Sequence, residues 1–372
     1  MTGLPGLPTV PAGPIGSTAP AGGGAALRRA VGAVLGEFLR GKAEAALREG
    51  LPEEVPLVLE DFLRAGGKRV RPALCLLGWY AAQGREPEQP IVRVAASLEL
   101  FHAFALIHDD LMDHSATRRG RPTLHRLLAA RHQTGRTPVA AERLGTGGAL
   151  LAGDVALAWS AELLHTAGLT PLQLTAALQR TDAMRTQVMY GQYLDLLSTG
   201  HPGPDTDIPW KIIRCKTAGY TFVHPLLLGA ELAGATPGVT TALAAYGRAA
   251  GEAFQLRDDL LGVFGRPDRT GKPNADDLRE GKHTLLLALA YQRADTAQRA
   301  VLDRYLGDPG LDEEGASHLR QVLVATGAYD AVQQTVQERS RAAIRALTHT
   351  SLPTAVHGAL VGLTAAMTAR TT

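Results

Sequence analysis

The sequence predicts an all-α protein that folds as one helical bundle around a central core. From Ala26 onward, apolar residues recur at helical spacing, and no segment alternates convincingly between apolar and polar residues as a strand would. Ala and Leu are abundant, and Pro or Gly recur where helices should begin or end. No repeat with a period of about 20 to 50 residues stands out, which disfavours a solenoid.

Composition narrows the class of protein. Of the 372 residues, 45% are apolar, 20% are charged and 5% are aromatic, which is typical of a globular chain rather than a disordered one. The net charge of +2 is small and the basic residues are spread out, so nucleic acid is not an expected partner. Cys75 and Cys215 lie in apolar stretches without ligand-like spacing. Neither a disulfide framework nor a zinc site is therefore expected, and a cytoplasmic location is predicted.

The N-terminal segment differs from the rest of the chain. Residues 1–25 contain seven Gly and five Pro, so they are predicted to form a flexible tail. The first charged residue is Arg28, so the positive segment of a signal peptide is missing. The best candidate for a transmembrane segment, 220–239, is interrupted by His224 and Pro225, and none is expected.

The remainder, 26–372, is predicted to be a single all-α domain. Residues that interrupt helices, chiefly Gly and Pro, are concentrated in three expected loops, around 131–140, 200–206 and 266–281. The predicted helices span 26–48, 55–64, 72–83, 90–117, 146–166, 171–198, 207–233, 238–264, 283–305, 312–326, 328–347 and 353–369.

An acidic motif, His-Asp-Asp-Leu-Met-Asp at 108–113, lies late in the predicted helix 90–117. Asp109 and Asp113 are four residues apart, so both carboxylates project from one face of the helix about one turn apart. Such like charges repel by a few tenths of a kcal/mol, and a cation should offset that cost. Hard oxygen ligands suit Mg²⁺. A solvated acidic face is the alternative, but the apolar run before the motif places these acids at the end of a buried helix.

A second acidic pair, Asp258 and Asp259, closes the sequence Phe-Gln-Leu-Arg-Asp-Asp near the end of another apolar helix. Two acidic groups at the ends of two buried helices predict a cavity lined by carboxylates from both sides. Five acids exceed what a proton-transfer dyad needs, so the pattern favours a site for metal ions and a diphosphate.

Cations gather in a third motif, Gly-Gly-Lys-Arg-Val-Arg-Pro at 66–72. Pro72 suits the first position of a helix, where two glycines and three cations favour a phosphate anion. The P-loop spacing is absent, and an isolated basic turn is alternatively only solvated. Further cations follow the acidic pairs, so that the whole set describes a cavity for two polyphosphates, one bound through metal ions and one directly. These cations are Arg118, Arg119, Lys216, Lys272 and Lys282.

From about Ala26 to its end, the chain resembles the trans-prenyltransferases, the polyprenyl (isoprenyl diphosphate) synthase family, and most closely actinobacterial geranylgeranyl diphosphate synthases. The motifs that carry the resemblance are, in order, GGKRVRP, LFHAFALIHDDLMD, RRGRPT, GALLAGD, GQYLDL, KT, FQLRDD and TGKPNADDLREGKHT. The resemblance implies a helical bundle of the isoprenoid synthase type with a central substrate cavity, in a homodimer.

The resemblance also implies the reaction. Isopentenyl diphosphate condenses head to tail with an allylic diphosphate (dimethylallyl, geranyl or farnesyl) after Mg²⁺-assisted ionisation. Asp109, Asp113 and Asp258 are the implied ligands of three Mg²⁺ ions in the closed complex.

Further roles are implied by the match of each motif. The residues implied to contact the allylic diphosphate are Arg118, Lys216 and Lys272, with Lys282 neutralising the departing diphosphate. Those implied to bind isopentenyl diphosphate are Lys68, Arg71, His102 and Arg119. Those implied to face the reacting carbons are Thr217 and Gln255.

Product length is the least constrained property. In the family, bulk just before the first acidic motif forms a floor under the tunnel that holds the growing chain. Phe104 with the small Ala105 resembles synthases that stop at geranylgeranyl diphosphate, with farnesyl diphosphate and longer polyprenyl products as the alternatives. Phe101 either narrows the same tunnel or belongs to the core.

The chain departs from the family pattern near the second acidic pair. Gly262 replaces the usual third acid, Arg266 stands where many relatives carry Asp, and Ala275 replaces a common Gly. These changes bear on rate and metal affinity rather than on reaction type. Two other functions compete with chain elongation. A class I terpene cyclase would need no isopentenyl site, whereas a non-catalytic partner subunit normally loses an acidic motif.

Overall fold

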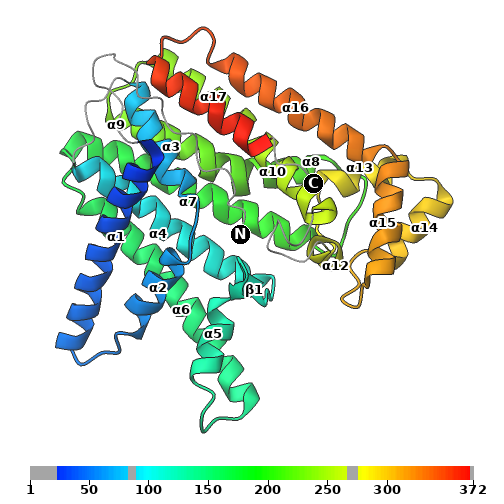
Figure 1. Ribbon diagram of the computed structural model, residues 1–372, viewed down its shortest axis with the longest axis horizontal. Helices are drawn as coiled ribbons and strands as arrows, with labels where there is room; N and C mark the ends of the chain where they lie inside the picture. Colours follow the sequence, from blue (N-terminus) through cyan, green and yellow to red (C-terminus); the bar gives the residue numbers. More distant parts are fainter. Residues whose placement is uncertain (1–22, 83–88, 266–274, 369–372) are drawn as a thin grey trace.

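The structure is a computed structural model that describes residues 23–82, 89–265 and 275–368 (Figure 1). It confirms the all-α class, since helices make up nearly all of its regular structure. The helices are α1 (Gly23–Arg48), α2 (Glu54–Arg64), α3 (Val70–Ala81), α4 (Gln89–Met112), α5 (Leu124–Arg131), α6 (Pro138–His165), α7 (Pro171–Ser198), α8 (Asp207–Ile212), the π-helix η1 (Ile213–Val223), α9 (His224–Leu232), α10 (Pro237–Phe264), α12 (Asp276–Glu280), α13 (Leu285–Arg293), α14 (Thr296–Tyr305), α15 (Glu313–Ala325), α16 (Ala328–Ala346) and α17 (Thr354–Thr368).

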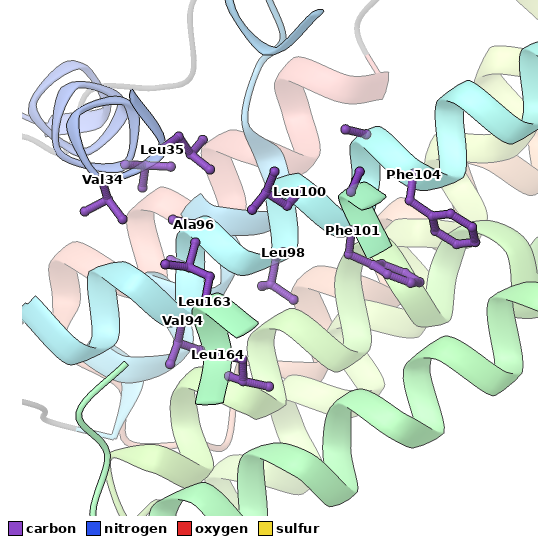
Figure 2. Close-up of a cluster of buried hydrophobic side chains, with 14 of the residues drawn as sticks. Val34, Leu35, Val94, Ala96, Leu98, Leu100, Phe101, Phe104, Leu163 and Leu164 are labelled. Carbon is purple, nitrogen blue, oxygen red and sulfur yellow. The ribbon is translucent and has the colours of Figure 1, made fainter. Parts of the chain in front are cut away.

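Helix α4 runs through the core of the N-terminal half. Its apolar residues point to all sides, which is typical of a helix surrounded by other helices. Figure 2 shows its side chains meeting α1 and α6, and full burial of each such side chain contributes about 1.5–3 kcal/mol. The labelled residues of this cluster are Val34, Leu35, Val94, Ala96, Leu98, Leu100, Phe101, Phe104, Leu163 and Leu164.

By length and composition alone, α4 and α6 could each cross a membrane, so the expectation that 220–239 was the best candidate is wrong. The explanation for α4 is its burial, because a core helix passes the same test. Helix α6 is less buried and keeps part of its apolar surface exposed.

Helix α10 is the second central helix, packed against η1, α16 and α17 in the C-terminal half (Figure 1). Glycine allows its closest approach to η1. A Cβ atom at Gly251 would lie 2.5 Å from the Cα atom of Ala218, a separation that real Cβ atoms do not show. This contact brings together two of the helices that line the cavity described below.

Several predicted helix boundaries are wrong. The helix predicted over 90–117 ends at Met112, because the chain turns back there with positive φ at His114 (50°) and Arg119 (54°). The turn pairs β1 (Thr117–Arg118) with β2 (Arg121–Pro122) in a short antiparallel hairpin that the sequence did not predict.

The stretch after this hairpin is more helical than predicted. Helix α5 was not predicted, and α6 begins at Pro138, inside the expected loop 131–140 and before the predicted start at 146. The Thr137 side chain accepts a hydrogen bond from the Ala140 amide, and proline suits the next position. This Thr-Pro start signal was present in the sequence.

Corrections also apply to the rest of the chain. The predicted helix 207–233 is divided into α8, η1 and α9, and the predicted helix 283–305 breaks where Asp295 forms a capping box that starts α14. The expected loop 266–281 contains α12. Helix α1 begins at Gly23, so the last residues of the predicted tail are helical, and residues 1–22 lie outside the described part.

Candidate active site

A cavity of about 2100 Å³ lies between α4, α7, η1, α10 and the segment around α12. It brings together side chains from nearly every motif that the sequence singled out. The candidate residues that line it are Lys68, Arg71, His102, Phe104, Ala105, Asp109, Asp113, Arg118, Lys216, Thr217, Gln255, Asp258 and Lys282. Lys272 and Arg266 lie outside the described residues.

At the end of α4, cations hold the first acidic motif. Lys216 Nζ lies 3.1 Å from Asp109 Oδ1, and Arg118 reaches both Asp109 Oδ2 at 3.1 Å and Asp110 Oδ1 at 2.7 Å. Burial alone would raise the pKa of Asp109, but Lys216 and Arg118 outweigh it, and the pKa falls to about 2. Asp109 is therefore ionised, and its charge is offset by Arg118 from the nearby hairpin and by Lys216 from a distant part of the chain.

Asp113, four residues after Asp109 and just past the end of α4, is paired with Lys282. The two atoms Lys282 Nζ and Asp113 Oδ2 are 2.9 Å apart, and Lys282 also lies 3.0 Å from Glu280. Burial lowers the pKa of Lys282, but Asp113 and Asp277 outweigh it and hold that pKa well above its ordinary value. Lys282 thus links the segment after α12 to the end of α4.

At the end of α10, the second acidic pair has different neighbours. Gln255 donates a hydrogen bond of 2.8 Å to Asp259 and accepts one of 2.6 Å from Thr217. Burial raises the pKa of Asp259 to about 8, and Asp277 and Asp258 add to the shift. Asp259 therefore holds its proton over most of the acidic and neutral range.

Gly262 leaves room for an acid from elsewhere in the chain. A Cβ atom at Gly262 would overlap Oδ2 of Asp277, and Asp277 lines the cavity from α12. The carboxylate of Asp277 thus occupies the place where a side chain at position 262 would begin. Asp277 had no predicted role, although it lies within the motif TGKPNADDLREGKHT.

The π-helix η1 supplies Lys216, Thr217 and Tyr220 to the cavity. π-Helical turns are rare and are frequently found at functional sites. Lys216 Nζ donates to Asp195 Oδ2 at 2.6 Å, in addition to its contact with Asp109. Asp195 is a second residue that the sequence analysis missed, and its signal was the quoted motif GQYLDL on α7.

Arg71 and His102 form a partly buried polar group in the cavity wall. Arg71 donates to Thr221 Oγ1 at 2.7 Å, and its guanidinium lies 4.1 Å from the centre of the Tyr220 ring. The Tyr220 hydroxyl is hydrogen-bonded to His102 Nδ1. Burial, together with nearby Arg71, holds the pKa of His102 well below its ordinary value, so its imidazole is neutral.

Arg119 does not line the cavity, unlike the other candidates in the described residues. Its guanidinium packs beside Gly67, where a Cβ atom would lie 3.3 Å from it. The charge of Arg119 also favours the ionised form of the buried Glu99 of α4. Burial raises the pKa of Glu99, while Arg71 and Arg69 oppose the shift. Glu99 was missed as well, and its signal was an acid inside an apolar helix.

Phe104 and Ala105 line the cavity, whereas Phe101 does not. Phe101 is 2% exposed and packs against Phe104 and Tyr220, with ring centres 5.4 Å and 5.9 Å away. Phe101 is therefore a core residue. Across the described residues, no three His, Cys, Asp or Glu side chains converge into a ready-made metal site.

Comparison with known proteins decides the family. The model described as polyprenyl synthetase matches residues 52–323. The chain belongs to the polyprenyl synthetase family. This confirms the resemblance seen in the sequence, and the protein is a prenyltransferase.

Individual members of the polyprenyl synthetase family are similar over most of their length. A geranylfarnesyl diphosphate synthase of Aeropyrum pernix is 34% identical, over 72% of this chain and 79% of its own length. A geranylgeranyl diphosphate synthase of Mycobacterium tuberculosis is 32% identical, over 68% and 67% respectively. A crystal structure of geranylgeranyl pyrophosphate synthase from Corynebacterium glutamicum, complexed with isoprenyl diphosphate and magnesium, is 37% identical. It has a TM-score of 0.87 and covers 92% of this chain and 98% of its own.

Proposed function

We propose that this prenyltransferase condenses isopentenyl diphosphate with an allylic diphosphate and releases geranylgeranyl diphosphate as its main product. The observation that carries the proposal is a single cavity that combines two acidic helix ends, two separate groups of cations and a floor with a phenyl ring. A terpene cyclase or a non-catalytic subunit has no need of both cation groups and both acidic ends.

Asp109, Asp113 and Asp258 would hold Mg²⁺, and the family resemblance suggests three ions. The donor chemistry fits, because these are hard carboxylate oxygens on opposite sides of one cavity. The raised pKa of the buried Asp259, to which Asp277 and Asp258 contribute, supports this assignment, because a cation beside these acids would favour their ionised forms. When bound, Mg²⁺ would neutralise charge on the leaving diphosphate. We propose that Asp277 supplies the carboxylate that Gly262 lacks.

On the allylic side, Lys216, Arg118 and Lys282 would bind a diphosphate, with Lys272 as a further proposed contact. The first three are held by carboxylates in this structure, so they are oriented before a ligand binds. Preorganised cations stabilise charge that develops as the C–O bond breaks. Exclusion of water from the cavity protects the allylic cation until the double bond attacks it.

On the isopentenyl side, Lys68, Arg71 and His102 would bind the second diphosphate from the cavity wall, and Arg119, beside Gly67, is a further proposed contact. Arg71 and the neutral His102 lie partly buried beside Tyr220, where charge-assisted hydrogen bonds to a diphosphate would be strong.

Thr217 and Gln255 would face the reacting carbons between the two diphosphates. They bond to each other from η1 and α10, which fixes both side chains. The departing diphosphate would accept the proton lost after condensation.

Product length follows from the floor of the cavity. Phe104 projects into the cavity five residues before Asp109, while Ala105 leaves space beside it. The growing chain would stop at the Phe104 ring.

Chromatography of the products from labelled isopentenyl diphosphate and separate allylic primers tests this proposal. The wild type should yield mainly the C20 diphosphate, Phe104→Ala a product longer by at least one five-carbon unit, and Ala105→Phe a shorter one. Identical products from all three proteins would remove Phe104 as the floor. A cyclic hydrocarbon product would identify the protein as a terpene cyclase instead of a chain-elongating enzyme. No incorporation of label would identify it as a non-catalytic subunit.

We also propose a homodimer in the cytoplasm, with no nucleic-acid partner and no membrane-spanning segment. Exposed apolar side chains on α6 and on α7 support the dimer, because exposed apolar surface marks interfaces. Sedimentation at several concentrations should give twice the mass of the chain, 39.2 kDa, whereas a monomer throughout would contradict it. These side chains are Leu150 and Leu151 on α6 and Tyr190 and Leu197 on α7.

A further inference from the structure

The ring of Phe104 is held between two other rings on α4. Phe101 lies on one side, with ring centres 5.4 Å apart, and His108 meets it edge to face with ring centres 4.7 Å apart. Figure 2 shows Phe101 and Phe104 together at one end of the buried cluster. His108 is one helical turn beyond Phe104 and lines the cavity with it, whereas Phe101 is buried. His108 is therefore the neighbour of Phe104 on the cavity side.

His108 is itself fixed by α6. Its Nε2 atom lies 3.1 Å from the carbonyl oxygen of Leu150 and 3.6 Å from Oδ1 of Asp154. Between these two residues, Gly153 faces the ring, and a Cβ atom there would overlap Cδ2 and Nε2 of His108. Helix α6 thus provides an acceptor for the ring nitrogen and, by the absence of a side chain at 153, the space that the ring occupies.

We infer that His108 is a specificity-determining positioning residue for product length. Held by α6, its ring fixes the ring of Phe104 and so sets the depth at which the growing chain stops. This inference rests on the proposed role of Phe104 as the floor. Edge-to-face packing has a preferred geometry, so removal of the imidazole frees Phe104 to turn away from the chain.

Product chromatography of His108→Ala tests the inference, with Phe104→Ala as the reference. The His108→Ala product should be longer than that of the wild type by one five-carbon unit in a substantial fraction of turnovers. Damage to the site cannot imitate this result, because slower condensation favours early release and shorter products. The matched control is His114→Ala, which alters another histidine of the cavity wall and should leave product length unchanged.

Two further variants separate the possible outcomes. Gly153→Ala reaches the same ring from α6 without altering His108 or Phe104, and it should also shift product length. The double variant of His108→Ala with Phe104→Ala should give the same product as Phe104→Ala alone, since His108 acts through that ring.

Three results would decide against the inference or its premise. A normal product from both His108→Ala and Gly153→Ala, with a longer product from Phe104→Ala, would overturn the role of His108 and leave the floor intact. A double variant that elongates further would make His108 a part of the floor rather than a positioning residue. An unchanged product from Phe104→Ala would remove the proposed floor and with it the inference.

Discussion

The two acidic motifs of this protein have nearly the same sequence, Asp-Asp-Leu-Met-Asp at the end of α4 and Asp-Asp-Leu-Leu-Gly at the end of α10, but opposite surroundings. Asp109 is held by Lys216 and Arg118, and its pKa is lowered to about 2. Asp259 receives one hydrogen bond from the Gln255 amide and lies among acids, and burial raises its pKa to about 8.

The difference shows that an acidic motif determines which side chains could bind a metal ion, but not which charged residues surround them. At α4 the charges are offset without any ligand, so in the proposed site a diphosphate would take over Lys216 and Arg118 while the carboxylates bind metal ions. At α10, Asp258 and Asp277 add to the burial that raises the pKa of Asp259, so a cation near these acids would favour its ionised form. Binding of Mg²⁺ together with diphosphate would thus reduce the repulsion between the acids at α10. At α4 it would exchange the ion pairs between carboxylates and cations for contacts with the metal ions and the diphosphate.

The largest expected effect tests whether both motifs serve the same step. Asp109→Asn and Asp258→Asn should each lower kcat on the order of 10²–10³-fold and change KM much less, because both acids would hold charge used as the leaving group departs. Steady-state kinetics with each substrate varied in turn would measure this. Near-normal turnover in Asp109→Asn would remove the metal assignment at α4.

A second prediction concerns Asp277, whose carboxylate lies where a side chain at position 262 would begin. Asp277→Asn should weaken binding of Mg²⁺ with inorganic diphosphate about tenfold, measured as a smaller thermal stabilisation by that pair of ligands. The double variant of Gly262→Asp with Asp277→Asn should recover much of the loss, because it returns a carboxylate to the same region of the cavity. Gly262→Ala is the control, since its Cβ displaces Asp277 without adding an acid. Full stabilisation of Asp277→Asn would show that Asp277 has no part in the metal site.

A third prediction separates the two substrates, which the two motifs alone cannot do. Arg71→Ala and His102→Ala should raise KM for isopentenyl diphosphate about tenfold, as expected for loss of a charge-assisted contact. Lys216→Ala should instead affect the allylic substrate or kcat, because Lys216 contacts Asp109 and Asp195. If Arg71→Ala weakened only the allylic substrate, the assignment of the two sides would be reversed.

The smallest expected effect is on stability as a function of pH, without Mg²⁺ or substrate. The folded-state pKa of Asp259, about 8, lies above its ordinary 3.8, so its contribution to stability is full below about pH 4 and is lost as pH rises through 8. The pKa of Asp109 is shifted the opposite way, so its contribution is present above about pH 4 and is lost as pH falls toward 2.

Thermal unfolding from about pH 5 to about pH 9 distinguishes the two motifs. The melting temperature of Asp259→Asn should fall less with rising pH than that of the wild type, while Asp109→Asn should retain the wild-type slope. Equal slopes in the wild type and Asp259→Asn would show that Asp259 is already ionised at pH 5.

The sequence by itself determined the helical class, the placement of the acidic groups at helix ends and the family. Hydrophobic periodicity and the four-residue spacing of Asp109 and Asp113 are local properties, and they can be read from neighbouring residues. The end of α4 was predicted five residues too late because the positive φ of His114 and Arg119 gives no strong local signal. Thr137 and Pro138 did give one, and that start was missed.

Only the tertiary structure decided which charges meet. Lys282 and Asp113 are 169 residues apart in the chain, and the motifs did not show that Lys216 also pairs with Asp195 or that Asp277 occupies the space beside Gly262. The π-helical form of η1 and the packing of the His108 ring against Gly153 likewise depend on how the helices pack. Such contacts, and the pKa shifts that follow from them, arise from burial and from neighbours brought together by the whole fold, so local spacing cannot specify them.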